Sequence, residues 1–338
     1  MDQYRYGYDR ASNRLYRDNL VLPSLGEVYA YDGLNQVTGY QRGTLNAGRT
    51  GVTGTPARTQ GYDYDAAGNF DGVTTDGVAQ ARTANRQNEV TAVAGAAAPA
   101  FDAAGNMTAD ETGRQLVYDA WNRLVAVKTS GGVYLASYAY DGMGRRVSET
   151  PGSGAGTDLY YSSGWQVVEE RVGGVARASY VWSPVYVDAL VARDRDADGN
   201  SGNGLEERVY VLADANHNVT AVVSASGVVL ERYTYDPFGI AQVRDAAGAV
   251  KSGGTGYAWL YLHQGLRLDP AVGLYDNFGR WYSPTLGRFA SLDPIRFAAG
   301  DANLYRYEGN GPVDRLDPTG LSTRPGMRRM FHAPHISD

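Results

Sequence analysis

The acidic stretch DRDADGNSGNGLEE, residues 194–207, has the residue spacing of a calcium-binding loop. Carboxylates at alternate positions are followed by a glycine, in the order Asp194, Asp196, Asp198 and Gly199. Calcium takes oxygen ligands at this spacing, and the backbone carbonyl of Asn200 stands at the next ligand position. The twelfth position, usually Glu, is Leu205, and Glu206 and Glu207 follow one and two residues late. Because no flanking helices are expected, the sequence predicts either a calcium-binding hairpin loop or an acidic, solvated loop tip.

Other motifs for chemistry are weak. The chain has no cysteine, which excludes disulfides and thiolate metal sites. The glycine-rich run GSGAGT, residues 152–157, lacks the lysine and the following helix of a phosphate-binding loop. No Gly-x-Ser-x-Gly nucleophile motif is present in the sequence, so no constellation supports a metabolic enzyme.

Charge and hydropathy exclude two further classes. The net charge is −6, whereas a nucleic-acid-binding protein would show a basic stripe, so we expect no nucleic-acid partner. The N-terminal MDQYRYGYDR is polar and aromatic, unlike a signal peptide. The most apolar run, VAGAAAPAF at 93–101, is too short and too broken to span a bilayer. The chain begins in the middle of a repeat pattern, so we expect a fragment of a longer protein with Met1 as an added start.

The elements that carry these residues are expected to be short strands. Tyr occurs 26 times and Gly 43 times; Tyr favours pleated sheets and Gly supplies the positive φ of tight turns. An aromatic-Asp pair followed by Gly or Asn recurs as YDRASNRL from Tyr8, YDGLNQV from Tyr31, YDAAGNF from Tyr64, FDAAGNMT from Phe101, YDAWNRL from Tyr118, YDGMGRRV from Tyr140 and YDPFGIA from Tyr235. The Tyr ends a strand, the Asp accepts from backbone N–H groups of a turn, and the Gly or Asn takes the left-handed position. The repeat unit is therefore strand, turn, strand.

On these motifs the sequence resembles the YD-repeat, or Rhs-repeat, proteins: bacterial Rhs toxins, the C components of insecticidal toxin complexes and, more distantly, the teneurins. The resemblance covers about residues 2–321 and is strongest at 273–321, which is similar to the Rhs-associated core. It implies an all-β fold whose repeated YD hairpins form one spiralling sheet, a partial or whole hollow shell. It divides the chain into repeats at 1–256, a core that closes the shell at 257–321, and a disordered tail or stub of a variable segment at 322–338.

The resemblance also implies self-cleavage. In Rhs and toxin-complex C proteins, the core ends in Asp-Pro-x-Gly-Leu, and an aspartyl-protease-like arrangement cuts the chain after that leucine. The matching residues here are Asp317, Pro318, Thr319, Gly320 and Leu321, which place the cut at Leu321–Ser322. An upstream segment, GRFASLDPI, supplies Asp293 as the second carboxylate and Arg288 to orient one of the two.

The implied chemistry is that of two close carboxylates. They cannot both ionise easily, so one holds a proton as an acid while the other serves as a base for water. The sequence alone does not show that Asp293 and Asp317 meet; the alternatives are Asp269, Asp276 and Asp314. Asp before Pro is also a good turn former, so the alternative for both motifs is that they form turns. Any activity would be a single turnover on the protein's own chain.

Two functions follow as hypotheses. In the first, the chain is the structural shell of a secreted or cell-surface bacterial toxin protein, and it encloses or presents its own C-terminal polypeptide or toxin cargo. A secretion-system or toxin-complex protein would be its partner, no cofactor is required, and Ca²⁺ would bind only at the acidic loop.

In the second hypothesis, the chain is a binding module for carbohydrate or other cells, without enzymatic activity. The side chains that could stack on sugars are Trp121, Trp165, Trp182, Trp259 and Trp281, although tryptophans in strands are more often core residues.

Overall fold

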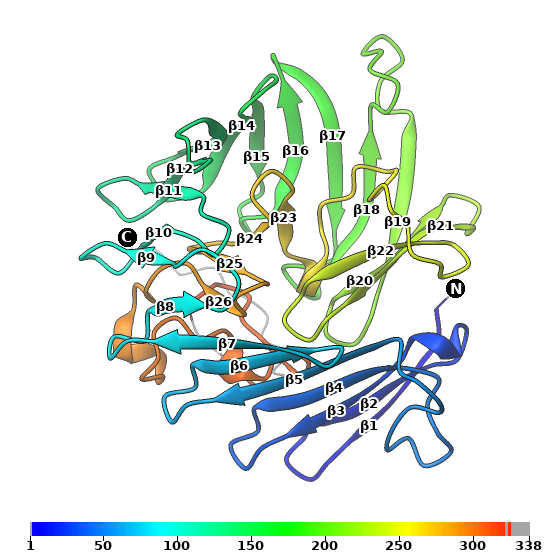
Figure 1. Ribbon diagram of the computed structural model, residues 1–338. Coiled ribbons are helices and arrows are strands. Elements are labelled where there is room, and N and C mark those ends of the chain that lie inside the picture. The colour runs from blue at the N-terminus through cyan, green and yellow to red at the C-terminus, as the bar shows by residue number, and fades with distance from the viewer. Residues whose placement is uncertain (1, 322–323, 326–338) are drawn as a thin grey trace, which may run out of the picture.

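The computed structural model describes residues 2–321 and 324–325, and the regular secondary structure of these residues is almost entirely antiparallel strands. Two large sheets curve around a third, smaller one (Figure 1). In both large sheets the strands follow one another in chain order, as successive hairpins require. The predicted all-β shell of repeated hairpins is therefore confirmed. Its wall is divided between two sheets, because residues 94–99 contain Gly95 and Pro99, which do not favour strand pairing.

The first sheet has eight strands. They are β1 (Tyr4–Tyr8), β2 (Arg14–Asn19), β3 (Gly26–Tyr31), β4 (Val37–Gly43), β5 (Arg58–Tyr64), β6 (Phe70–Thr75), β7 (Val78–Ala84) and β8 (Val90–Val93). A short 3₁₀ helix, η1 (Pro23–Leu25), connects β2 to β3.

The second sheet has fourteen strands and includes the acidic loop between β18 and β19. Its strands are β9 (Ala100–Phe101), β10 (Met107–Ala109), β11 (Gln115–Tyr118), β12 (Leu124–Lys128), β13 (Tyr134–Tyr140), β14 (Arg146–Pro151), β15 (Thr157–Tyr161), β16 (Val167–Val172), β17 (Val175–Trp182), β18 (Leu190–Arg195), β19 (Glu207–Ala213), β20 (Val219–Ser224), β21 (Val229–Tyr235) and β22 (Ala241–Asp245).

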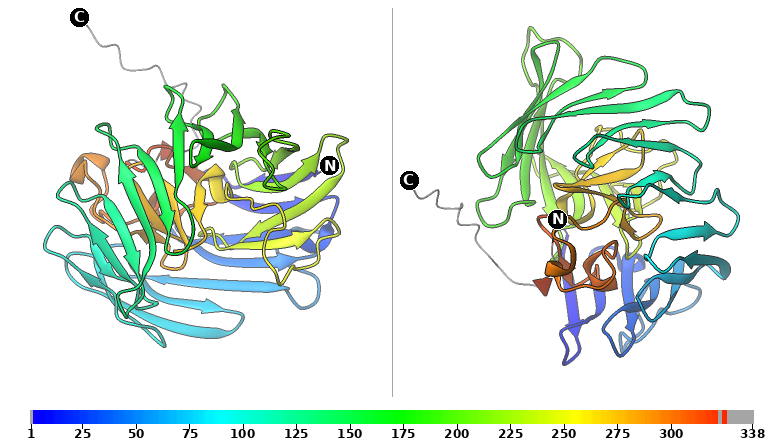
Figure 2. Two further views of the ribbon diagram at one scale, coloured as in Figure 1. Left: turned by 90° about the horizontal axis from the view of Figure 1, so that it is seen from above. Right: turned by 90° about the vertical axis from the view of Figure 1, so that its left-hand side faces the viewer.

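Residues 257–321 lie between the two large sheets, on their inner side (Figure 2). Their four-stranded sheet consists of β23 (Arg267–Asp269), β24 (Leu274–Asn277), β25 (Arg280–Ser283) and β26 (Arg288–Phe289). Three 3₁₀ helices accompany it: η2 (His263–Gly265), η3 (Arg296–Ala299) and η4 (Glu308–Asn310). A last pair joins β27 (Arg315–Leu316) to β28 (Arg324–Pro325). The remainder of the expected tail, 322–323 and 326–338, falls outside the described residues.

The aspartate holds the turn in the predicted way in six of the seven repeats quoted above, whereas the Asp236 carboxylate accepts from Arg58 and Gln60. After β9, Asp102 Oδ1 accepts hydrogen bonds from the backbone N–H groups of Ala104 and Asn106, both at 2.9 Å. Gly105, between them, has a left-handed φ of 83°. The same two hydrogen bonds are made in the turns that begin at Asp9, Asp32, Asp65, Asp119 and Asp141. These bonds replace the partners that the turn backbone would otherwise take from water.

In several hairpins the tyrosine that ends the strand before a turn joins the hairpin to the previous one. Its hydroxyl donates to a backbone carbonyl at the start of a preceding strand, at 2.5–2.8 Å, in the pairs Tyr31 to Arg14, Tyr64 to Val37, Tyr140 to Leu124, Tyr161 to Arg146 and Tyr235 to Val219. The ring packs on the sheet while the hydroxyl satisfies a carbonyl, which explains why the repeat uses tyrosine more often than phenylalanine.

Residues 257–321, here called the inner segment, share a hydrophobic core with both large sheets. Trp281 of β25 packs on Tyr138 of the second sheet with ring centroids 4.9 Å apart, and Arg82 of the first sheet donates to the backbone carbonyl of Leu286 at 3.3 Å. The two large sheets also contact each other through the buried ion pair of Arg17 with Asp214. Within the described residues, no helix has the length and apolar character needed to cross a bilayer.

Candidate active site

Asp293 and Asp317, which are 24 positions apart in the sequence, meet around one guanidinium group. Arg280 Nη2 lies 3.1 Å from Asp293 Oδ2 and 3.5 Å from Asp317 Oδ2. All three side chains are buried, with at most 5% of each exposed. The structure thus brings the two predicted carboxylates to one place, at the first residue of β25.

The arginine at this site is Arg280, which the sequence did not single out. Arg288, which the sequence predicted for this role, instead donates to the backbone carbonyl of Asn88 at 2.7 Å and to Asn69 Oδ1 at 3.2 Å. Its guanidinium also lies over the ring of Tyr305. The structure therefore corrects the expectation that Arg288 orients a carboxylate. Arg288 is closer to Asp293 in sequence, but it is Arg280 whose position at the start of β25 carries its side chain to both carboxylates.

The three alternative aspartates have other partners. Asp269 accepts from the Tyr138 hydroxyl at 2.7 Å, Asp276 lies 3.0 Å from Arg146, and Asp314 accepts from the backbone N–H of Arg14 at 3.3 Å. None of them has a described contact with Arg280.

The DPTGL motif forms a turn of the same kind as the repeat turns. The Asp317 carbonyl accepts from the Gly320 N–H at 3.3 Å, and Asp317 Oδ1 accepts from the Leu321 N–H at 3.1 Å. Gly320 has a left-handed φ of 66°, and its carbonyl accepts a hydrogen bond from Arg280 Nε. A role as a turn and a role as a cleavage site are therefore compatible, because the turn itself places Leu321 beside Asp317. Ser322, on the far side of the predicted cut, falls outside the described residues.

Burial controls the protonation of this site. Burial raises the pKa of Asp293, although the charge of Arg280 opposes that shift. Burial also lowers the pKa of Arg280 to about 10. Nearby, burial raises the pKa of Asp188 to about 8, and the charge of Asp317 adds to that shift. A raised pKa favours the protonated form of a carboxyl, which is the form that an acid in peptide cleavage requires.

Room for a water molecule exists beside Asp293. A cavity of about 10 Å³ is lined by Arg280, Asp293, Asp301, Leu304 and Arg306, among others. A volume of about 10–15 Å³ is the lower limit for one water molecule, and the lining supplies both donors and acceptors. The site can therefore bring water to a carboxylate.

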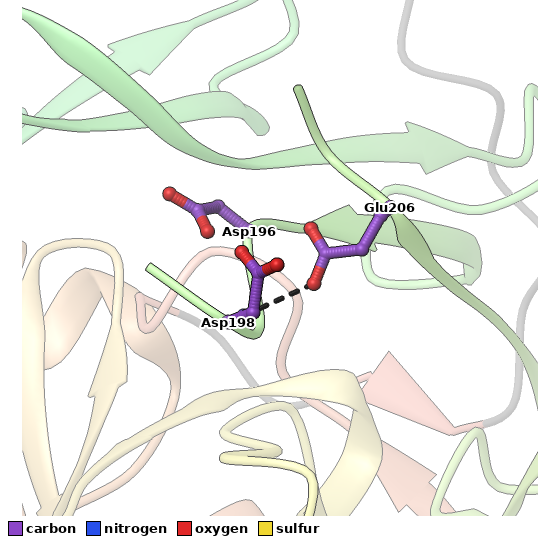
Figure 3. Close-up of side chains that lie close together, drawn as sticks. All are labelled: Asp196, Asp198 and Glu206. Atoms are coloured by element: carbon purple, nitrogen blue, oxygen red, sulfur yellow. Dashed lines mark hydrogen bonds between the residues drawn. The ribbon is translucent and has the colours of Figure 1, made fainter. Parts of the chain in front are cut away.

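The acidic loop brings together a different set from the predicted one. Ligand atoms of Asp196, Asp198 and Glu206 lie within 4.8 Å of one another (Figure 3). Asp194, in contrast, forms a two-bonded ion pair with Arg208 at 2.6 Å, so it is turned away from this group. The Asn200 backbone N–H donates to Asp198 Oδ1 at 2.8 Å. The set that could hold a cation is thus two of the predicted aspartates, Asp196 and Asp198, and Glu206 from the far end of the loop.

The tryptophans offer little surface for sugar stacking. Trp121 is 76% exposed at a turn, whereas Trp259 and Trp281 are buried and Trp165 and Trp182 are half-buried. Sugar-binding sites usually present several aromatic faces, so the geometry does not favour the carbohydrate-binding alternative.

Comparison with known proteins agrees with the hairpin repeat. A family model described as the teneurin YD-shell matches residues 12–313. The tRNA3(Ser)-specific nuclease WapA of Bacillus spizizenii is 29% identical over 77% of this chain and 11% of its own length. Toxin subunit YenC2 of Yersinia entomophaga is 26% identical over 95% of this chain and 37% of its own length. The crystal structure of TcdB2-TccC3-Cdc42 superposes with a TM-score of 0.71 at 20% identity, over 95% of this chain and 17% of that one. The chain therefore spans only a fraction of these relatives.

Proposed function

This chain belongs to the teneurin YD-shell family, and from that premise we propose that it is the shell part of a bacterial toxin protein that cuts its own chain after Leu321. One observation carries the proposal: Arg280 joins Asp293 and Asp317, and the same arginine holds the carbonyl of Gly320, the residue before Leu321. Turn formation alone does not require the two Asp-Pro motifs to share a buried guanidinium.

In the proposed reaction one of the two carboxyl groups is ionised and the other carries a proton. The ionised carboxylate takes a proton from water, and the resulting hydroxide adds to the carbonyl carbon of Leu321. The C–N bond to Ser322 then breaks, and the protonated carboxyl supplies the proton that the leaving nitrogen needs. The products are a chain that ends in the Leu321 carboxylate and a segment that begins with the Ser322 amine. One water molecule is consumed, and the reaction occurs once per chain.

Asp317→Asn is expected to abolish the product that ends at Leu321. Asparagine keeps the shape of the side chain but neither binds nor releases a proton at neutral pH. The full chain is expressed and its products are identified by intact mass spectrometry, with Asp314→Asn as a matched control at a neighbouring aspartate that does not contact Arg280. Full-length wild-type protein alone, under all conditions, would contradict self-cleavage.

The inner surface of the sheets is the expected place for a cargo polypeptide. A cavity of about 550 Å³ lies between β5–β8 and the inner segment, lined by Tyr62, Phe70, Arg82 and Phe238, among others. In the full-length protein, the shell encloses or presents the polypeptide that follows Leu321. The relatives named as toxins support a secreted or surface location and a protein partner from a secretion system or toxin complex.

As a second activity, the acidic loop is proposed to bind Ca²⁺ through Asp196, Asp198 and Glu206. The converging carboxylates support it, and loop sites of this kind bind with a Kd of roughly 10⁻⁴–10⁻³ M. Ca²⁺ in the millimolar range should raise the melting temperature of the wild-type protein, and Asp198→Asn should remove that rise. Asp194→Asn is the control and should retain it. A melting temperature that does not respond to Ca²⁺ would leave the loop as an acidic, solvated tip.

A further inference from the structure

The hairpin between β24 and β25 holds the terminal turn. Arg280 Nε donates to the Gly320 carbonyl, and a Cβ placed on Gly279 would lie 3.6 Å from Leu321 Cδ2. A Cβ on Gly320 would collide with the backbone oxygen of Asn277. Gly320 thus allows a backbone approach that a residue with a Cβ would not permit, and the dipeptide before the predicted cut lies directly on this hairpin.

Asn277 has an unusual environment in this hairpin. Its side chain is fully buried, yet neither Nδ2 nor Oδ1 makes a hydrogen bond among the described residues. Buried side-chain amides are nearly always paired, because an unpaired donor loses its bonds to water without compensation. Such an amide has a physical reason to be there if it gains a hydrogen-bond partner during a reaction of the protein.

The position of Asn277 identifies that partner. Its Cγ lies 3.5 Å from the place that a Cβ on Gly320 would occupy, so the amide is adjacent to the backbone that leads into Leu321. The other nearby donors are engaged. Arg280 is bonded to Gly320 and Leu304 and paired with both carboxylates, and the Leu321 N–H donates to Asp317.

We propose that the Asn277 side-chain amide donates a hydrogen bond to the Leu321 carbonyl oxygen as that oxygen becomes negatively charged during cleavage. The inference rests on the proposed self-cleavage and adds a residue to it. When hydroxide adds to the carbonyl carbon, the π electrons move to the oxygen, and Asn277 Nδ2–H stabilises the resulting oxyanion. When the C–N bond to Ser322 breaks, the electrons return and the carbonyl is restored in the new carboxylate. A donor fixed in a dry site before the reaction is effective because it needs no reorganisation.

Asn277→Leu tests the proposal through two readouts that move in opposite directions. Leucine has a similar shape and no polar atoms, so it should raise the melting temperature by removing an unpaired amide from the core. The same change should slow formation of the Leu321 product by about 10²–10³-fold, the usual effect of losing one oxyanion donor. The rate is measured on the full chain by pulse labelling during cell-free synthesis, and Phe278→Leu, which changes packing in the same hairpin but removes no donor, should cleave within a few-fold of the wild type.

The outcomes separate this inference from the proposed function on which it rests. If Asp317→Asn abolishes cleavage while Asn277→Leu cleaves at the wild-type rate, the role of Asn277 is overturned and self-cleavage stands. If the wild-type chain yields no Leu321 product, or if Asp317→Asn still yields it, both ideas fail. Should Asn277→Leu not fold, Asn277→Ala adds no bulk and carries the same expectation for the rate.

Discussion

Replacing Arg280 by methionine is expected to abolish the Leu321 product and to lower the free energy of unfolding by about 3–5 kcal/mol. The guanidinium is the buried counter-ion of both Asp293 and Asp317, and it lies 3.5 Å from the centroid of the Phe289 ring. Methionine retains most of the apolar length but removes the positive charge that lies beside both buried carboxyls. Loss of that charge raises the pKa of Asp293 further, so a carboxylate base is less available to activate water.

Urea unfolding and intact mass spectrometry of the full chain check the two parts of this prediction. Arg208→Met serves as a control, because its ion pair with Asp194 is largely exposed and its removal should leave the urea midpoint unchanged. Adding Asp293→Asn to Arg280→Met should recover part of the lost stability, since it removes the buried Asp293 carboxyl, which has lost its ion pair with Arg280. A variant that is as stable as the wild type, or that still cleaves, would show that Arg280 does not couple the two carboxylates.

The repeat and its turns were predictable because their causes are local. Asp102 and its equivalents bind backbone N–H groups two and four residues ahead, so the turn is specified within one short stretch of sequence. The link from each repeat to the one before it was not predicted. The hydrogen bond from the Tyr64 hydroxyl to the Val37 carbonyl spans 27 positions and depends on how neighbouring hairpins pair in register.

The candidate site was predicted only where a motif marked it. Asp293 and Asp317 came from two Asp-Pro motifs, and the structure places them together. Arg280 has no such motif, since it reaches the site through the pairing of β24 with β25. The same reason applies to Glu206, which joins Asp196 and Asp198 by closure of a loop and not by calcium-loop spacing. Asn277 was recognised because its buried amide has no hydrogen-bond partner among the described residues, which cannot be predicted from the sequence.

Acid should destabilise the fold through His263. The imidazole is 1% exposed, and neither ring nitrogen has a hydrogen-bond partner among the described residues. Four tyrosine rings surround it at centroid distances of 6.0–6.3 Å: Tyr235, Tyr275, Tyr282 and Tyr307. Burial lowers the pKa of His263 to about 3, and the charge of Asp214 only partly opposes that shift.

The sign of the effect follows from the two pKa values. Between the ordinary histidine pKa of about 6.5 and the folded value of about 3, the unfolded chain binds a proton that the folded chain does not. The free energy of unfolding therefore falls as the pH falls through this window, by roughly 3 kcal/mol between pH 7 and pH 4 from this residue alone. The four rings come from β21, β24, β25 and the segment before η4, so a charged imidazole would loosen the contact between the second sheet and the inner segment.

His263→Leu should retain stability at pH 7 and lose much less of it at pH 4 than the wild type. Leucine has nearly the volume of histidine and cannot bind a proton, so the difference between the two proteins isolates this residue from the carboxylates that titrate in both. Urea midpoints at pH 7, 5.5 and 4 measure that difference. His217→Leu is the control, because His217 is less buried and stacks on Tyr186 away from the four rings. If the stability of wild type and of His263→Leu falls in parallel with pH, the imidazole takes up its proton in the folded state as readily as in the unfolded chain. That result would contradict the prediction that burial among the four tyrosine rings keeps His263 neutral.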